Sequence, residues 1–267
     1  MSTEPLPRSP EPCLLREDRD GVAHLALNRP TRQNALCEEL IAALGNAAHE
    51  IAHDAAVRVV VISGRGPAFC AGHDLREMHA QRDLGYYRAL FARCTQMMLS
   101  LAALPQPVIA RVHGVATAAG CQLVATCDLA IASEGARFAT SGIDVGLFCA
   151  TPAVPLSRNV PRKRAFEMLA TGAFIDAPTA LAFGLVNRVV PEPELDAAVA
   201  ALAATLATKS RVALAAGKRL FARQLEEGLE DAYALACEAM AQNLMAEDAG
   251  EGVDAFLHKR KPVWRGR

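Results

Sequence analysis

Residues 108–132, VIARVHGVATAAGCQLVATCDLAIA, carry the pattern that decides the fold. The stretch opens with a β-branched strand run at 108–112, which the His-Gly pair at 113–114 breaks. Residues 116–126 then form a helical pattern with almost no side-chain bulk in its first turn, and 128–132 is a second strand run. A strand, a short helix and another strand in direct succession predict a β-α-β unit in a parallel sheet.

The same alternation extends along the chain in both directions. Strand runs at 21–27, 57–62 and 136–139 alternate with helical patterns at 37–52 and 84–104. From Pro161 onward helical patterns follow one another, at 163–171, 177–183, 192–208, 211–227 and 229–246. We therefore expect an α/β fold with a flexible lead-in at 1–12, an α/β core at 13–200 and a helical C-terminal region at 201–267.

Composition excludes several classes of protein. The chain has 267 residues, of which 52% are hydrophobic and 21% charged, and its formal net charge is −1. These values exclude a disordered chain, and without a basic excess we expect no nucleic-acid partner. No apolar run approaches the roughly 20 residues of a membrane-spanning helix, so we expect no membrane partner.

The cysteines and the N-terminal segment lead to an expected location. Eight cysteines are present without a C-x-x-C pair or a histidine cluster, which predicts reduced thiols and no metal site. The first residues lack the apolar core of a secretory signal, and Glu4 and Glu11 are atypical of a mitochondrial address. We therefore expect a cytoplasmic protein.

Two turns that follow strands are candidates for a binding site. Residues 67–78 and 113–123 are both rich in small side chains, which expose backbone N–H groups to a ligand. Two such groups that converge on one carbonyl oxygen form an oxyanion hole. The alternative is that the small residues only permit tight packing of helix against sheet.

Taken in order, these motifs resemble the crotonase (enoyl-CoA hydratase/isomerase) superfamily. The matching segments cover about residues 20–264 and are Asn28-Arg-Pro-Thr-Arg-Gln-Asn-Ala-Leu36, Phe69-Cys-Ala-Gly-His-Asp-Leu75, the 114–128 stretch, Ala182-Phe-Gly-Leu-Val-Asn-Arg-Val-Val190 and the tail 251–264. The resemblance implies a crotonase-like spiral of ββα units with a helical C-terminal trimerisation region. It also implies an acyl-CoA thioester as ligand and a homotrimer or a dimer of trimers.

The resemblance also assigns site residues. The N–H groups of Ala71 and Ala119 would hold the thioester carbonyl. CoA would bind along the 67–78 turn, at Ala71, Gly72, His73 and Asp74. It would meet cations from the 28–36 loop, at Arg32, and from the tail, at Lys259 and Arg260. For the cations, the alternative is an ordinary solvated surface. No metal or redox cofactor is implied, and CoA would enter only as part of the substrate.

Both glutamates on which hydration depends in this superfamily are replaced. Gln122 stands at the first position and Gly142 at the second. An amide accepts no proton from water near pH 7, and glycine has no side chain at all, so we expect hydratase activity orders of magnitude below that of a two-glutamate relative.

Two other side chains are candidate acids or bases. Asp144 would share the face of Gly142 if this segment were a strand, although a turn or helix-start aspartate is the alternative. His73 would titrate at neutral pH beside the expected hole, or else line the CoA channel. Three functions stay open. The first is an enzyme of fatty acyl-CoA metabolism with a non-standard acid or base, which catalyses isomerisation, thioester hydrolysis or weak hydration (lyase or isomerase chemistry). The others are acyl-CoA binding or regulation without turnover, and a partner subunit of an active relative.

Overall fold

The computed structural model describes residues 11–267, and the first ten residues of the expected lead-in lie outside them. Its larger sheet has six strands: β1 (Leu14–Arg19), β2 (Val22–Leu27), β3 (Val59–Gly64), β5 (Val108–Val112), β7 (Leu129–Ser133) and β10 (Arg188–Val190), in the order β1-β2-β3-β5-β7-β10. All neighbouring pairs are parallel except β1–β2, a hairpin turned by Asp20 and Gly21. Both turn residues have positive φ, which suits the twist of a hairpin.

A second sheet contains four short strands, three of which directly follow a strand of the first. It comprises β4 (Ala68–Cys70), β6 (Val115–Thr117), β8 (Arg137–Ala139) and β9 (Ile175–Asp176), in the order β4-β6-β8-β9. The chain thus passes from β3 to β4, from β5 to β6 and from β7 to β8 before it enters a helix. This repeated ββα path is the crotonase-like spiral expected from the sequence.

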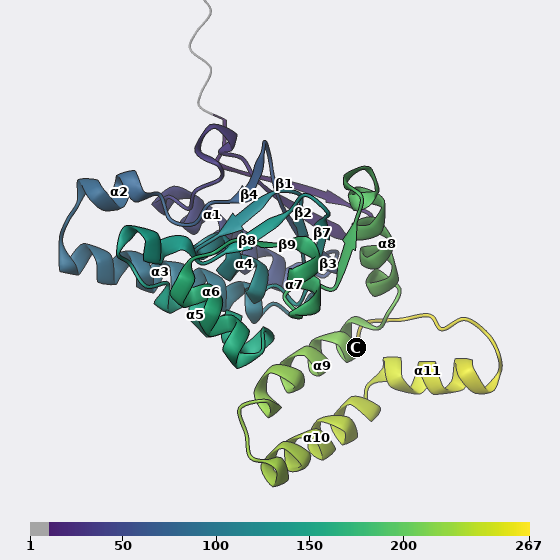
Figure 1. Ribbon diagram of the computed structural model, residues 1–267. Coiled ribbons are helices and arrows are strands. Elements are labelled where there is room, and N and C mark those ends of the chain that lie inside the picture. Colours follow the sequence, from purple (N-terminus) through teal and green to yellow (C-terminus); the bar gives the residue numbers. More distant parts are fainter. Residues whose placement is uncertain (1–10) are drawn as a thin grey trace, which may run out of the picture.

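Helices cover both faces of the larger sheet (Figure 1). On one face α1 (Glu38–His53), α3 (Leu84–Ala102) and α4 (Ala119–Thr126) enclose the main core. On the other, α8 (Leu195–Ala207) packs on Val59, Val61 and Ile109 through Leu195, Val199 and Ala203. The central strands are apolar without alternation because they are buried on both faces.

Helix α4 is the most deeply buried helix segment near the site. All residues from Ala119 to Ala125 are buried. A Cβ at Gly120 would lie 2.0 Å from the carbonyl oxygen of Cys70, so only glycine permits this approach of α4 to β4. The small residues of this segment therefore set how close the two candidate turns come.

Several elements differ from the predicted ones. Helix α4 begins at Ala119 and not at residue 116, because residues 115–117 form β6. Helix α8 lies within the helical pattern predicted at 192–208, but it crosses the expected core boundary at residue 200 and packs on the sheet along its length. The remaining helices before residue 208 are α2 (Leu75–Ala80), α5 (Ala150–Asn159), α6 (Arg162–Thr171) and α7 (Ala177–Ala182). Short 3₁₀ helices are η1 (Pro30–Arg32), η2 (Ser141–Val145) and η3 (Glu192–Glu194).

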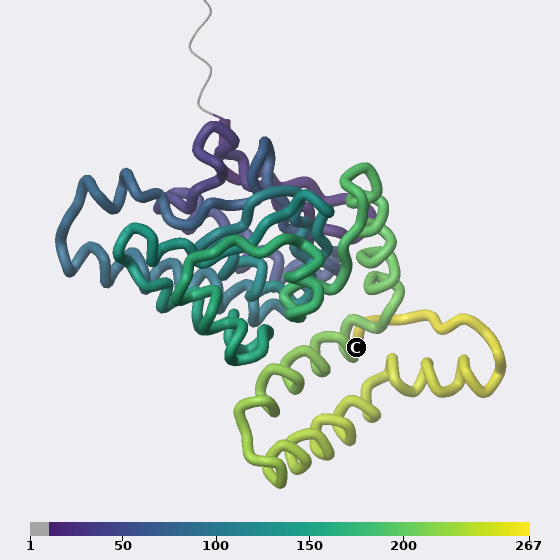
Figure 2. The backbone as a smooth tube through the Cα atoms, in the orientation of Figure 1, coloured from purple at the N-terminus to yellow at the C-terminus, as the bar shows by residue number. Residues whose placement is uncertain are grey.

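After α8 the chain leaves the core, as the green-to-yellow part of Figure 2 shows. This region contains α9 (Arg211–Gln224), α10 (Leu229–Leu244) and α11 (Glu247–Leu257), and α9 packs against α10. Large apolar side chains of these helices are exposed: Phe221, Leu225, Leu229, Tyr233, Met240, Leu244, Met245, Val253, Phe256 and Leu257. Within residues 11–267 no single helix is long and apolar enough to cross a membrane, and one pair bent by 104° (192–207 with 211–224) passes on length and composition alone.

Asp248 links residues 265–266 to the start of α9 by hydrogen bonds. Its side chain, 1% exposed, accepts hydrogen bonds from Ser210 Oγ (2.6 Å) and from the N–H groups of Arg265 (2.7 Å) and Gly266 (3.0 Å). Burial alone would raise the pKa of Asp248, but these hydrogen bonds outweigh it and hold that pKa below its ordinary value. The charged form is therefore the one that the fold stabilises.

Replacing Asp248 by Asn should lower the free energy of unfolding by about 1–3 kcal/mol at pH 7, because buried donors lose a charged acceptor. The stabilisation is present above the ordinary Asp pKa of about 3.9 and is lost as the pH falls toward the depressed folded value. Urea unfolding of wild type, Asp248→Asn and the exposed control Asp231→Asn measures it. A difference between wild type and Asp248→Asn that stays the same down to about pH 3 would contradict the role of the charge.

Candidate active site

The two candidate turns touch each other at the end of the second sheet. Strand β4 pairs with β6, so the segments that follow them run side by side. Gly72, with φ +91°, is the point of contact: a Cβ there would lie 2.8 Å from Ala118 Cβ and 3.2 Å from Ala119 N. The glycine is required by both its conformation and this close approach.

The N–H groups at this contact are not the expected pair. Ala71 donates its N–H to the carbonyl oxygen of Gln33 at 3.0 Å, so the prediction that Ala71 is an oxyanion donor is wrong. Leu36 bonds to both neighbours of His73, since its N–H donates to Gly72 O (2.7 Å) and its oxygen accepts from Asp74 N (3.1 Å).

In this parallel bridge the backbone N–H and C=O groups of His73 itself point away from Leu36. Its N–H has no partner within residues 11–267. Ala119 N is the first N–H of α4 and is likewise unpaired within the described part of the chain, as helix-terminal N–H groups are. The structure therefore brings two free N–H groups together, those of His73 and Ala119.

An apolar cavity of about 220 Å³ adjoins these groups. His73, Ala118, Ala119 and Gly142 contribute to its wall. The rest is mainly apolar: Leu75, Met78, Phe91, Val145, Leu147, Phe148, Cys149 and Pro152. Ser141 adds a hydroxyl, which lies 2.8 Å from the Thr117 hydroxyl.

A second hollow of about 270 Å³ shares Ala71 and Leu75 with the first and is more open to solvent. Its lining includes Arg32 and Asp74, which the resemblance assigns to CoA, and also Arg76, which the sequence did not single out. The available signal for Arg76 was its position two residues after Asp74, a residue type that caps helices. Lys259 and Arg260 line neither hollow, and Arg260 is paired with Glu251 and Asp254 in the C-terminal region.

Asp74 has a structural role at the mouth of this hollow. It caps α2 through Arg76 N (3.1 Å) and pairs with Arg29 at 3.0 Å. Burial opposes its charge, but Arg29 and the capping N–H outweigh that effect and lower the pKa of Asp74. The Arg29–Asp74 ion pair thus links the loop that contains Arg32 to the 67–78 turn.

The two replaced glutamate positions differ in their surroundings. Gln122 is buried in the first turns of α4, and its Oε1 has no hydrogen-bond partner among residues 11–267. Gly142 lines the cavity within η2, where a Cβ would lie 2.5 Å from Leu147 O and 2.7 Å from Cys149 Sγ. The backbone and the Cys149 thiol therefore occupy the space that a side chain at 142 needs.

The thiol of Cys149 is protonated at neutral pH. Burial raises its pKa, and a hydrogen bond from the Gly142 N–H opposes this effect only in part. It acts as a filler of the cavity wall, because a nucleophilic thiol needs a lowered pKa.

Asp144 does not face the cavity. It is exposed, and a Cβ at Gly172 would lie 3.0 Å from both of its carboxylate oxygens, so the side chain points to the end of α6. Residues two apart in a 3₁₀ turn diverge by roughly 120°, whereas on a strand they share a face. The expected catalytic carboxylate is therefore directed away from the site, because 141–145 is a 3₁₀ turn.

The imidazole of His73 lies in the cavity wall and packs edge-on against Phe91, with ring centroids 5.5 Å apart. Neither ring nitrogen has a hydrogen-bond partner within residues 11–267. Burial lowers the pKa of His73 to about 4, with a smaller opposing effect from the Leu36 backbone. The ring is therefore neutral at pH 7, unlike the titrating group expected from the sequence. No three His, Cys, Asp or Glu side chains of the described residues are grouped to hold a metal.

Comparisons with known proteins agree with this architecture. Residues 17–267 match the family model described as enoyl-CoA hydratase/isomerase. The rat protein named enoyl-CoA hydratase domain-containing protein 3, mitochondrial, is 44% identical over 267 residues, which cover 98% of this chain and 88% of that protein. The crystal structure of an enoyl-CoA hydratase from Mycobacterium smegmatis is 58% identical, with a TM-score of 0.93 over 95% of this chain and 99% of that one. The human enoyl-CoA hydratase domain-containing protein 3 structure is 44% identical, with a TM-score of 0.92 over 94% and 100%.

The comparisons correct the expected location. The curated mammalian relatives are named as mitochondrial proteins, which does not fit the predicted cytoplasmic one. Reduced thiols and a balanced charge do not distinguish the cytoplasm from another reducing compartment. On the family model, the close relatives and the fold, the chain belongs to the enoyl-CoA hydratase/isomerase (crotonase) family, in the branch of enoyl-CoA hydratase domain-containing protein 3.

Proposed function

We propose that this protein binds acyl-CoA thioesters and holds the thioester carbonyl between the N–H groups of His73 and Ala119. The single observation that carries the proposal is the position of these two free donors, between an apolar cavity and a cation-lined hollow. The acyl chain would occupy the first, and the phosphates of CoA would meet Arg32 and Arg76 at the second.

The chemistry of such a site is polarisation of the carbonyl. Two fixed donors in apolar surroundings stabilise negative charge on the oxygen far better than water-exposed donors do. Charge drawn to the oxygen makes the α-carbon more acidic and the β-carbon of an enoyl group more electrophilic. Removal of a proton from the α-carbon and addition of water to the β-carbon both also need a group that accepts or donates a proton.

Proton transfer is where this site departs from a hydratase. Gln122 accepts no proton from water near pH 7, and no side chain is present at 142. His73 is the imidazole beside the donors, but its pKa of about 4 makes it a weak base. Hydration should therefore be slower by a factor of about 10²–10⁴ than in a relative with both glutamates.

The blocked position at Gly142 favours a second function, acyl-CoA binding without turnover. A site that had merely lost a glutamate would keep room for one, whereas Leu147 and Cys149 fill that room. In this form the protein would act as a binding or regulatory protein, or as the partner subunit of an active relative.

The exposed apolar side chains of α9, α10 and α11 support self-association. A concentration of large exposed apolar side chains in one region is typical of an interaction surface. We therefore propose a homotrimer or dimer of trimers built through this region. The proposal includes no metal or redox cofactor, since the donors of the site are backbone N–H groups.

An exchange experiment in D₂O tests the function. The purified protein is titrated with saturated and 2-enoyl acyl-CoAs by calorimetry and then incubated with each in D₂O, with mass spectrometry of the thioester and a two-glutamate relative in parallel. We expect binding of acyl-CoA, with hydration at least about 100-fold below the relative. Failure to bind any acyl-CoA, or hydration at the rate of the relative, would contradict the proposal.

A further inference from the structure

A third cavity, of about 450 Å³, lies between the core and the C-terminal region. Its walls come from the end of α1, the loop at 54–58, the Pro105–Pro107 segment and the first turns of α9. It shares no lining residue with the two hollows of the candidate active site. The acyl-CoA proposal therefore leaves this cavity unexplained.

Three arginines line it from opposite sides. Arg211 and Arg219 lie on one face of α9, because they are spaced by two helical turns with Ala215 between them, and Arg58 comes from the core. Arg58 donates one N–H to Lys209 O at 2.5 Å, and Arg211 donates its Nε–H to Gly266 O at 3.2 Å. Each guanidinium carries five N–H donors, so most stay available.

The third arginine is free, and nearby carboxylates do not neutralise the cluster. Arg219 has no hydrogen bond or ion pair from its side chain within residues 11–267. Asp54, the one carboxylate among the described lining residues, pairs with Arg16 and accepts from Ala56 N. Asp248, close to Arg58, is committed to three donors of its own. The cavity wall is therefore positively charged.

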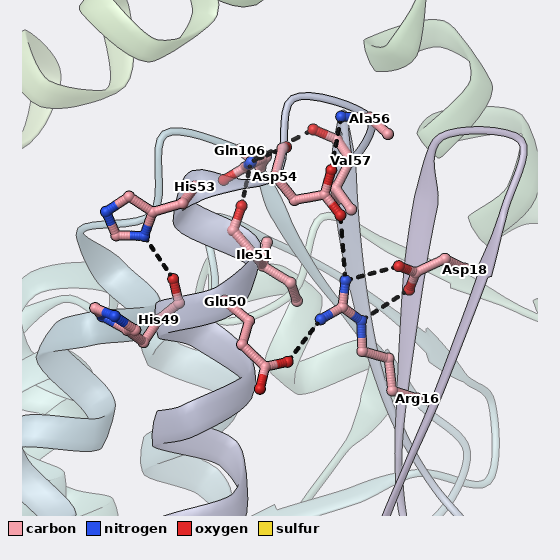
Figure 3. A network of polar contacts seen from close by, with 10 residues as sticks. All are labelled: Arg16, Asp18, His49, Glu50, Ile51, His53, Asp54, Ala56, Val57 and Gln106. Atoms are coloured by element: carbon pink, nitrogen blue, oxygen red, sulfur yellow. Dashed lines mark hydrogen bonds and ion pairs between the residues drawn. The ribbon is translucent and has the colours of Figure 1, made fainter.

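Gln106 lines the same wall and has an unsatisfied acceptor buried behind it. It is 8% exposed, and Figure 3 shows its amide nitrogen directed at the carbonyl groups that end α1. The nitrogen donates to Ile51 O at 2.8 Å and faces Val57 O at 3.4 Å. Flipping the amide would set oxygen against these carbonyl oxygens, so the orientation is fixed. Oε1 is left without a partner among residues 11–267.

A buried acceptor without a donor is costly, and a ligand with a hydroxyl or amino group would satisfy it. The three arginines, in contrast, need a negatively charged group on the ligand. The apolar side chains of Val57, Pro105 and Leu214 would cover a ring. One molecule that combines these three features fits the whole cavity.

We propose that this cavity binds a phosphate monoester of about the size of a mononucleotide. The phosphate would bind to Arg211, Arg219 and Arg58, since guanidinium groups match phosphate oxygens in paired hydrogen bonds. A hydroxyl or amino group of the ligand would donate to Gln106 Oε1 once a shift of the surrounding wall exposes that atom, since it is buried in this structure. The volume exceeds that of free phosphate and lies in the range of small-molecule sites. Such a ligand would bridge the core and α9, apart from acyl-CoA binding.

Calorimetric titration with AMP, ribose 5-phosphate and inorganic phosphate tests the proposal. The titrations are made on the whole protein without CoA, because the adenosine of CoA itself carries a phosphate monoester and would compete for the cavity; the Arg32→Ala variant separates the two sites instead. We expect AMP to bind at least ten-fold more tightly than inorganic phosphate. Arg219→Ala should weaken AMP binding at least ten-fold, whereas Arg223→Ala, an exposed change one turn further along α9 and outside the cavity, should leave it unchanged.

Three results would overturn it: no binding of AMP, equal affinity for AMP and inorganic phosphate, or AMP binding that is lost in Arg32→Ala and kept in Arg219→Ala. The last result would place AMP in the proposed CoA hollow. Acyl-CoA binding is measured on Arg219→Ala as well, and its retention there keeps this test separate from that of the proposed function.

Discussion

The Gln122→Glu/Gly142→Glu variant is expected to remain at least about 100-fold less active as an enoyl-CoA hydratase than a two-glutamate relative. Restoring both residue types does not restore the site, because the backbone at 142 no longer has space for a side chain. A Cβ there would lie 2.5 Å from Leu147 O and 2.7 Å from Cys149 Sγ. Leu147 is also held in place, since its N–H donates to Gly142 O at 2.9 Å.

The obstruction is measured separately from catalysis by a smaller change. Gly142→Ala should lower the free energy of unfolding by about 1–3 kcal/mol, the usual cost of overpacking. Gly135→Ala is the matched control, because a Cβ at Gly135 meets no atom within 4 Å. Near-normal hydratase turnover of the double variant, or Gly142→Ala as stable as Gly135→Ala, would show that the position is open and would contradict this account.

The layered fold could be predicted because burial leaves a clear sequence signal. Strands such as β3 are covered by α8 on one side and by α1 and α3 on the other, and an unbroken β-branched run results. Of the strands in the second sheet, only β8 was predicted, as the run at 136–139. All four have only two or three residues, which is too short for a period to appear.

The candidate site was predicted in part. The motifs located the two segments, but the choice of donor depends on which N–H groups are already bonded. The carbonyl oxygen of Gln33 accepts the Ala71 N–H, and the Leu36 bridge leaves the His73 N–H without a partner among residues 11–267, so the donor that we propose lies two residues further along. Contacts between a motif and a loop almost 40 residues earlier are not visible in sequence patterns.

Asp144 and His73 show how local geometry and burial decide a role. Asp144 stands two residues from Gly142, and only the 3₁₀ turn directs it to α6. His73 is an ordinary histidine in sequence, yet its buried ring has a pKa of about 4. Neither the turn type nor the burial could be predicted from the residues alone.

Replacing Ala119 by Pro should weaken polarisation of the thioester, because only the His73 donor remains. Proline is tolerated at the first position of a helix, where Ala119 lies, and it removes the N–H. Ala118 (φ 50°, ψ −121°) lies outside the extended region favoured before proline, so the folded fraction of the variant is measured first. Loss of one oxyanion donor lowers turnover by about 10²–10³ where turnover occurs. Ala119→Gly is the control, because it changes the side chain and keeps the donor. Circular dichroism confirms that both variants are folded.

The infrared stretching frequency of a ¹³C-labelled thioester carbonyl tests the central claim most directly, since it needs no turnover. With an acyl-CoA labelled at the carbonyl, we predict a lower frequency in the complex than in water for wild type and Ala119→Gly, and a smaller decrease for Ala119→Pro, which keeps only the His73 donor. A bound acyl-CoA whose carbonyl frequency in the wild-type protein equals that in water would contradict the assignment of His73 and Ala119 as its donors.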